Sequence, residues 1–207
     1  MKKMRNMLTV IACLFTVITV KAQEKGEVKL NLNYNYSMPV GSFKNDLISN
    51  ASPRGASGSI LYGFNNKWAA GLYVGYQDYY QKYPRTIYQT GKNQNTSAVL
   101  SNSIQTMPFM AKGKFSPLTT GFIRPYVTAA AGGNLIDFRQ YLGEFGGSET
   151  SVSFAAQGGV GIEIPFGRLS SSGFHIGATY NYVPYTRNGY KNLNAVNLQA
   201  GISIPLR

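Results

Sequence analysis

The residues that could carry acid–base or metal chemistry are few in this chain. His175 is the only histidine among 207 residues, Cys13 is the only cysteine, and 8 residues are acidic. A zinc site needs several His, Cys or carboxylate ligands at suitable spacing, and one histidine without a neighbouring nucleophile gives no Ser-His-Asp arrangement. We therefore expect a protein that is not an enzyme and that has no catalytic residue, metal site or cofactor.

One group of side chains combines a carboxylate with several cations. The strand pattern described below places Glu163 and His175 on the inward face of neighbouring strands, near the same end. The cations expected to face inward at that end are Lys29, Lys112, Lys114 and Arg124. Two interpretations stay open. The group is either a proton-linked or anion-binding site, or an interior ion-pair cluster in which the cations keep a buried carboxylate charged; the second is the simpler.

The expected long loops carry a second group of candidates, in which basic side chains are interleaved with tyrosines. These basic residues are Lys82, Arg85, Lys92, Arg187 and Lys191. Such a surface would suit the phosphates of lipopolysaccharide or another acidic surface ligand. The alternative is a solvated loop with ordinary interfacial tyrosines. Nucleic acid is not expected as a partner, because the N-terminus predicts export.

The first residues have the pattern of a secretory signal. Basic residues precede an apolar run at 8–20, and Ala22 offers a small residue before a cleavage site. The run is shorter than the roughly 20 residues that a spanning helix needs. The pattern thus predicts a cleaved signal at 1–22 and one mature domain at 23–207, for which the strand pattern below predicts an outer-membrane barrel. The alternative is a lipoprotein cleavage box that ends at Cys13, and whether Cys13 is lipidated stays open.

Composition excludes several classes of protein. Apolar residues make up 43% of the chain and charged residues only 14%, whereas soluble domains carry about a quarter charged residues. The apolar fraction argues against disorder, and a mean hydropathy of −0.16 argues against a bundle of membrane helices. Loss of the signal removes four of the 20 basic residues, which leaves 16 against 8 acidic ones and a net charge of +8.

Period-two alternation of apolar and polar residues is the main structural signal, and it is typical of strands with two different faces. The clearest example is 152–164, where Val, Phe, Ala and Ile alternate with Ser, Gln, Gly and Glu. Pro108 suggests a bulge in one strand. The eight predicted strands are 28–38, 56–64, 68–76, 104–115, 123–135, 152–164, 174–182 and 196–206.

The connections alternate between long and short, as in an up-and-down membrane barrel with short periplasmic turns and longer outer loops. The long segments are 39–54, 81–97, 137–150 and 184–194. The short turns are 65–67, 116–121 and 165–173. Strands of about 9–11 residues are enough to cross a bilayer at the usual tilt, so the predicted strands fit.

The placement of charge separates a membrane barrel from a soluble one. A soluble barrel or β-sandwich must put charged residues on its outer face, but here the polar face is mostly Asn, Ser, Gln, Thr and Gly, which suits a narrow lumen. The fold class we predict is therefore all-β, an eight-stranded antiparallel up-and-down transmembrane barrel. The aromatic residues expected at the two membrane interfaces are Tyr36, Phe64, Trp68, Tyr76, Phe115, Phe174 and Tyr182.

Three segments carry a resemblance: 32–43, which contains a Pro-x-Gly-x-Phe loop, 65–68 (Asn-Asn-Lys-Trp) and 124–126 (Arg-Pro-Tyr). They resemble a bacterial family, the outer-membrane β-barrel proteins common in Bacteroidetes. The resemblance implies an integral barrel in the outer membrane of a Gram-negative cell, inserted by the barrel-assembly machinery, and it implies no shared reaction. The chain departs from such barrels at its end, where Arg207 stands in place of the usual terminal aromatic residue.

The function we expect is structural or surface-interacting, without enzymatic activity and through the extracellular loops. The expected partners are outer-membrane lipid and lipopolysaccharide, and the oligomeric state stays open. A narrow channel or transporter for small solutes is the alternative, although side chains fill the interior of an eight-stranded barrel. A soluble periplasmic ligand carrier is a third possibility, and extraction without detergent would distinguish it.

Overall fold

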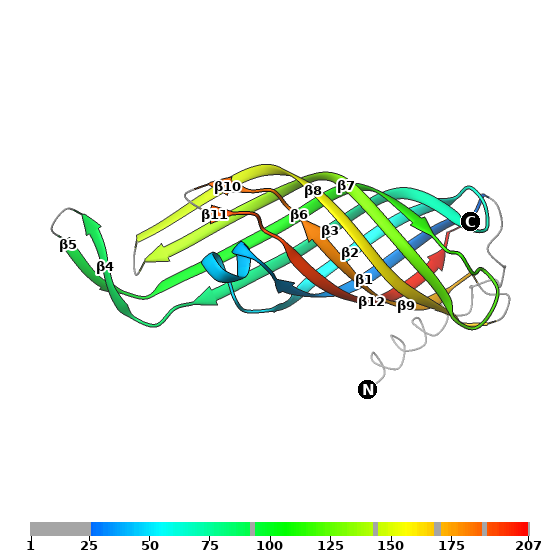
Figure 1. The fold of residues 1–207 in the computed structure, drawn as a ribbon, viewed down its shortest axis with the longest axis horizontal. Helices are drawn as coiled ribbons and strands as arrows, with labels where there is room; N and C mark the ends of the chain where they lie inside the picture. The colour runs from blue at the N-terminus through cyan, green and yellow to red at the C-terminus, as the bar shows by residue number, and fades with distance from the viewer. Residues whose placement is uncertain (1–25, 92–93, 143–144, 168–170, 188–189, 207) are drawn as a thin grey trace, which may run out of the picture.

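The structure is a computed structural model that describes residues 26–91, 94–142, 145–167, 171–187 and 190–206. Eight antiparallel strands form one closed barrel in the order β1-β12-β9-β8-β7-β6-β3-β2 (Figure 1). The barrel strands are β1 (Val28–Pro39), β2 (Ser52–Gly63), β3 (Trp68–Lys82), β6 (Leu100–Phe115), β7 (Arg124–Leu142), β8 (Phe145–Pro165), β9 (Gly173–Tyr182) and β12 (Ala195–Pro205). The predicted fold class is thus confirmed.

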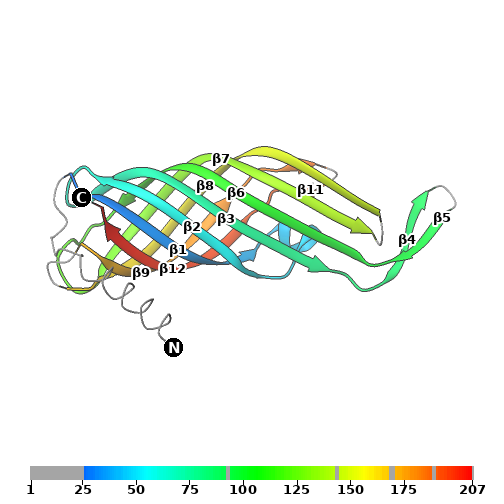
Figure 2. The same ribbon diagram turned by 180° about the vertical axis from the view of Figure 1, so that it is seen from behind.

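The two ends of the barrel differ. The turns after β2, β6 and β8 lie at the same end as the C-terminus, which we call the turn end, and the connections after β1, β3, β7 and β9 lie at the opposite, loop end (Figure 2). The first and last strands close the barrel through a continuous register from Lys29↔Pro205 to Pro39↔Ala195. Among the described residues, no helix is long and apolar enough to cross a membrane.

Alternation along each strand sorts the side chains as predicted. On β1 the buried residues are Lys29, Asn31, Asn33, Asn35 and Ser37, while Leu32, Tyr34 and Tyr36 are exposed on the outer face. The outer face of the whole barrel is apolar and the lumen is mostly polar, which is the reverse of a soluble barrel. Closure pairs the backbone groups of every barrel strand on both sides and leaves no sheet edge.

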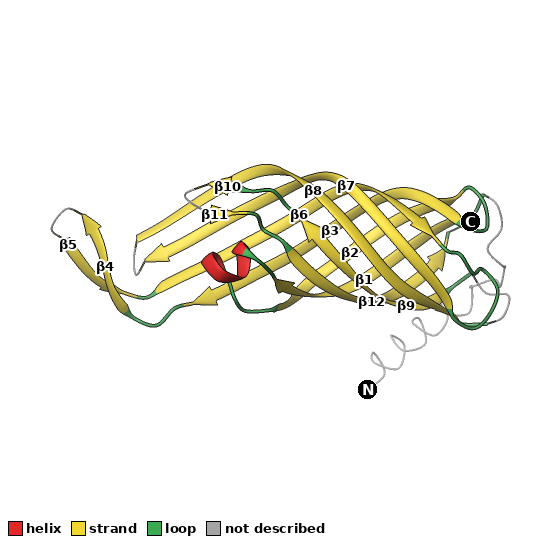
Figure 3. Cartoon of the chain, viewed as in Figure 1, coloured by secondary structure: helices red, strands yellow, loops and turns green. Residues whose placement is uncertain are grey.

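The loop end contains structure that the sequence pattern did not predict. The described residues of the segment 137–150 are strand, because β7 and β8 stay paired out to Leu142↔Phe145. The segment 81–97 contains a hairpin, β4 (Thr86–Gly91) with β5 (Gln94–Ala98). The connection between β9 and β12 contains the two-residue strands β10 (Thr186–Arg187) and β11 (Tyr190–Lys191). A short helix, η1 (Phe43–Leu47), follows β1 and is the red element in Figure 3.

Pro108 does not mark a bulge. The register between β3 and β6 is the same on both sides of it, from Val74↔Phe109 to Gln77↔Thr106. The proline lacks a backbone N–H, and the ladder with β3 is interrupted there without a shift. The irregularity lies instead between β1 and β2, where the register shifts between Asn35 and Ser37.

Candidate functional site

The charged residues of the lumen gather at the turn end, near the start of β1 and the end of β8. We call this group the turn-end charge cluster, and its members are Glu27, Lys29, Lys112, Lys114, Arg124, Glu163 and His175. All seven are buried. The sheet register explains part of the arrangement, because Arg124 on β7, Glu163 on β8 and His175 on β9 lie directly opposite one another.

Glu163 is the centre of the cluster's ion pairs. Its carboxylate accepts a hydrogen bond from the Lys114 ammonium group on β6. Its other oxygen lies 3.6 Å from Nζ of Lys29 on β1. Lys29 in turn lies 3.9 Å from the carboxylate of Glu27. One carboxylate therefore links strands that are far apart in the sequence and lie on different sides of the lumen.

Two cations of the cluster lack a carboxylate. The Nζ atom of Lys112 lies 5.0 Å from the centre of the Tyr73 ring, a cation–π contact. Neither Lys112 nor Arg124 forms an ion pair with a described residue. The buried Nε of Arg124 also has no hydrogen-bond partner in the described chain.

His175 belongs to a hydrogen-bond network of buried polar side chains. Its Nδ1 lies 3.1 Å from Oγ of Ser203, and its Nε2 bonds the side-chain oxygen of Asn33. Asn33 continues the network to Ser57 at 3.3 Å. In the described chain no three His, Cys, Asp or Glu residues are grouped so as to hold a metal ion. This hydrogen-bonded arrangement suits a structural role for His175 inside the lumen.

An apolar plug fills the lumen at the loop end, and the sequence pattern did not predict it. Pro39 ends β1, and Gly41 turns the chain with a φ of 62°, a left-handed conformation that favours glycine. Phe43 then enters the lumen and packs edge-on against Tyr79, with ring centres 4.9 Å apart. The plug residues from this segment, Phe43, Leu47 and Ile48, are buried with Ile104 and Ile136 of the wall.

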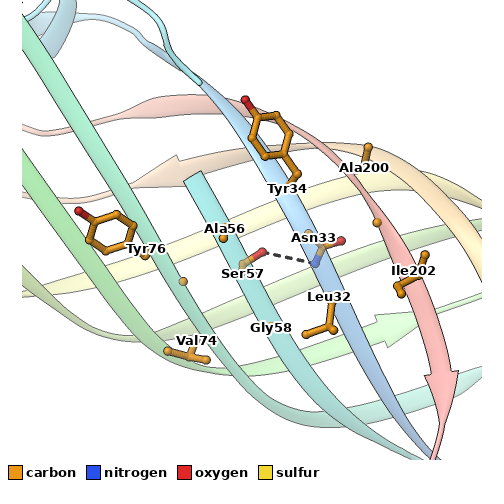
Figure 4. A pocket seen from close by; sticks show the side chains of 12 residues that line it. Leu32, Asn33, Tyr34, Ala56, Ser57, Gly58, Val74, Tyr76, Ala200 and Ile202 are labelled. Carbon is orange, nitrogen blue, oxygen red and sulfur yellow. Dashed lines mark hydrogen bonds between the residues drawn. The ribbon is translucent and has the colours of Figure 1, made fainter. Parts of the chain in front are cut away.

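The outer wall carries an apolar hollow of about 570 Å³ between β1, β2, β3 and β12 (Figure 4). The outer wall is recessed at this point because Ala56 and Gly58 of β2 have small side chains or none. Tyr34 and Tyr76 stand on either side of Ala56 in the cross-strand register. Asn33 and Ser57, joined by the dashed line in Figure 4, belong to the lumen side of the same strands.

Of the predicted loop cations, the structure describes the side chains of Lys82 and Arg85. Lys82 ends β3 and Arg85 precedes β4, and both are exposed. Arg187 and Lys191 lie on the separate β10–β11 pair, and their side chains are outside the described part of the structure. Lys92, Cys13 and the predicted signal at 1–22 also lie outside the described residues. In Figure 1 the β4–β5 hairpin extends farthest from the barrel.

Comparison with known proteins gives one family. The family model for the outer membrane protein beta-barrel domain matches residues 9–204. No curated protein matches the chain.

Several solved structures share the fold. Neisserial surface protein A is 17% identical with a TM-score of 0.51, covering 86% of this chain and 95% of that one. The attachment invasion locus protein Ail of Yersinia pestis is 14% identical with a TM-score of 0.51, covering 88% and 99%. OprG, an outer membrane protein of Pseudomonas aeruginosa, is 11% identical with a TM-score of 0.55, covering 91% and 100%. At these identities the likeness establishes the fold.

Proposed function

The chain belongs to the outer membrane protein β-barrel domain family, and from this premise we propose that it is a non-enzymatic surface protein that acts through its extracellular end. Barrels in the outer membrane have short periplasmic turns and longer extracellular loops. The loop end is therefore the extracellular end, and the apolar outer wall, including the hollow in Figure 4, contacts membrane lipid.

The closed lumen is the observation that carries this proposal. The plug residues block the extracellular end, and the turn-end charge cluster occupies the periplasmic end. Two interior cavities between and beside them measure about 20 Å³ each, which is room for about one water molecule. A solute path would need continuous space, so the interior favours a surface role over transport.

The extracellular end offers surface for a partner. β7 has 19 residues and β8 has 21, well above the roughly 9–11 that cross a bilayer, so both strands extend beyond the membrane. The β4–β5 hairpin extends farther still (Figure 1). Ile87 on this hairpin is 69% exposed, so the hairpin projects without burying its apolar side chain against the barrel.

Lipopolysaccharide is the partner that we propose for this surface. Lys82 and Arg85 are exposed at the base of the projecting hairpin, where they can reach phosphate groups at the membrane surface. During biogenesis we expect the barrel-assembly machinery to insert the chain. The Pro-x-Gly-x-Phe segment, which turns at Gly41 and inserts Phe43, supports the finer proposal that the barrel is of the Bacteroidetes type.

Binding of lipopolysaccharide to the purified barrel in neutral detergent tests the partner. We expect the double variant Lys82→Gln/Arg85→Gln to bind several-fold more weakly than the native barrel, and the difference to shrink at high salt. Lys67→Gln, an exposed lysine in the turn after β2, is the matched control. Equal binding of lipopolysaccharide by the native barrel, the double variant and the control would contradict lipopolysaccharide as the partner.

Conductance in planar bilayers tests the closed lumen separately. The native barrel should leave the membrane current at its lipid baseline. A steady single-channel conductance would overturn the surface role in favour of a narrow channel.

A further inference from the structure

We propose that the lumen binds one monatomic anion, of the chloride class, between Lys112, Lys114 and Gln199 in the turn-end charge cluster. This site is distinct from the extracellular surface, and its test does not depend on the identity of a surface partner.

The first argument is the charge count. The cluster contains four cations, Lys29, Lys112, Lys114 and Arg124, and two carboxylates, Glu27 and Glu163, all of them buried. Lys29 and Lys114 engage both carboxylates. The described cluster therefore has an excess of positive charge, and protonation of His175 would only increase it. An uncompensated charge buried inside the barrel is strongly unfavourable, so a bound anion would stabilise the cluster.

The second argument is a cavity at the place where the counter-ion is needed. A cavity of about 20 Å³ is lined by both Lys112 and Lys114, together with Tyr126, Thr128 and Gln199; Asn31, Asn33, His175 and the apolar Leu61 complete the lining. These side chains offer ammonium, hydroxyl and amide donors. No carboxylate of the described chain lines the cavity. The lining is therefore suited to an acceptor that carries negative charge.

The third argument is an unsatisfied donor in the same wall. Gln199 is only 5% exposed, and its Nε2 has no hydrogen-bond partner among the described residues. A buried amide N–H without an acceptor costs its full desolvation free energy. An anion in the cavity would accept this bond. It would also neutralise part of the lysine charge.

The size of the cavity selects the class of anion. About 20 Å³ has room for one small species. A halide ion is only slightly larger than a water molecule, whereas phosphate, sulfate and carboxylates are several atoms across. A water molecule would satisfy Gln199 but would leave the excess charge uncompensated. Charge and size together favour a halide.

Crystals of the full barrel grown with bromide in place of chloride test the site directly. We expect an anomalous bromide peak in the cavity, within hydrogen-bonding reach of Nζ of Lys112 and Nε2 of Gln199. A cavity that holds water alone, with bromide elsewhere or absent, would overturn the proposal.

Thermal unfolding in detergent provides a second readout. At equal ionic strength, chloride should raise the unfolding midpoint of the native barrel by several degrees over gluconate, in a saturable way. Lys112→Met should lose this difference, and Lys67→Met should keep it. If Lys112→Met does not fold, Gln199→Leu takes its place, and it too should lose the difference between the unfolding midpoints in chloride and gluconate. Identical midpoints of the native barrel in the two salts would show that the lysines need no counter-ion and would overturn the site.

Discussion

Glu163 connects four strands at the level of a single residue. Its carboxylate contacts Lys114 on β6 and Lys29 on β1, and it lies opposite Arg124 on β7 and His175 on β9. All of these groups are buried. Loss of this one negative charge would leave the cations with Glu27 as the remaining carboxylate of the described cluster.

Glu163→Gln is therefore expected to destabilise the barrel without changing its size or shape. Removal of one partner from a buried ion pair costs about 3–5 kcal/mol, because the remaining charge stays buried. Urea titration of the folded barrel in detergent, followed by the mobility of unheated samples on a gel, measures the free energy of unfolding.

Asp137→Asn is the matched control, since it makes the same chemical change in an ion pair near the surface. Asp137 pairs with Arg139 at 2.6 Å, and the side chains are 18% and 44% exposed. Pairs of this kind contribute about 1 kcal/mol or less. An equal decrease in the free energy of unfolding in the two variants would show that the buried ion pairs of Glu163 stabilise the barrel no more than a surface ion pair does.

The sequence predicted which side chains share the lumen, but not how they pair. Alternation assigns Lys29, Lys114 and Glu163 to the inward face, and their positions near strand ends assign them to one level. Glu27 was missed although it continues the alternation of β1, because it lies one residue before the predicted strand. The period of two along 196–206 places Gln199 on the inward face, but its unsatisfied N–H in the described chain depends on the side chains opposite, which no local pattern encodes.

At the scale of elements, the seam between β1 and β12 closes the barrel and depends on a glycine. Gly201 on β12 lies opposite Asn33 on β1. A methyl group at position 201 would overlap the backbone oxygen of Leu32 and lie 2.7 Å from Oδ1 of Asn33. The first and last strands therefore approach closely only because this residue has no side chain.

Gly201→Ala should weaken closure of the barrel, because the added methyl group forces β1 and β12 apart. We expect a cost of about 1–3 kcal/mol, typical of overpacking, and a lower yield of folded barrel on refolding into detergent. Gly133→Ala on β7 is the control, since a methyl group there meets no atom within 4 Å. If both variants refold like the native chain, the seam tolerates a side chain and the argument is wrong.

The elements at the loop end were the hardest to predict, for a physical reason. Alternation arises where one strand face meets lipid and the other meets the lumen. Beyond the membrane the outer face meets water instead of lipid, so the continuation of β7 and β8 through 137–142 and 145–150 mixes charged and apolar residues and has no period of two. The sequence indicates the plug only weakly: Phe43 and Leu47 are four residues apart, which is a helical spacing.

At the scale of the whole molecule, polar groups and tyrosines delimit the apolar band on the extracellular side. The pairs Arg54–Asp78 and Asp137–Arg139 lie on the outer wall at nearly the same level, because Asp78 is opposite Gln105 and Gln105 is opposite Asp137. Tyr76 lies just below, in the apolar band. On the turn side Trp68 packs on Phe115, with ring centres 4.5 Å apart. Aromatic residues mark both membrane interfaces in such barrels.

This geometry predicts different surroundings for two apolar residues that are almost equally exposed. Leu72 is 73% exposed in the apolar band, and Ile87 is 69% exposed on the projecting β4–β5 hairpin. We expect a spin label at Leu72→Cys in lipid vesicles, in a Cys13→Ser background, to be accessible to oxygen and protected from a water-soluble nickel chelate. The label at Ile87→Cys should show the opposite preference, because water surrounds the hairpin. A nickel-accessible label at Leu72→Cys would place the apolar wall outside the membrane and contradict this placement of the barrel.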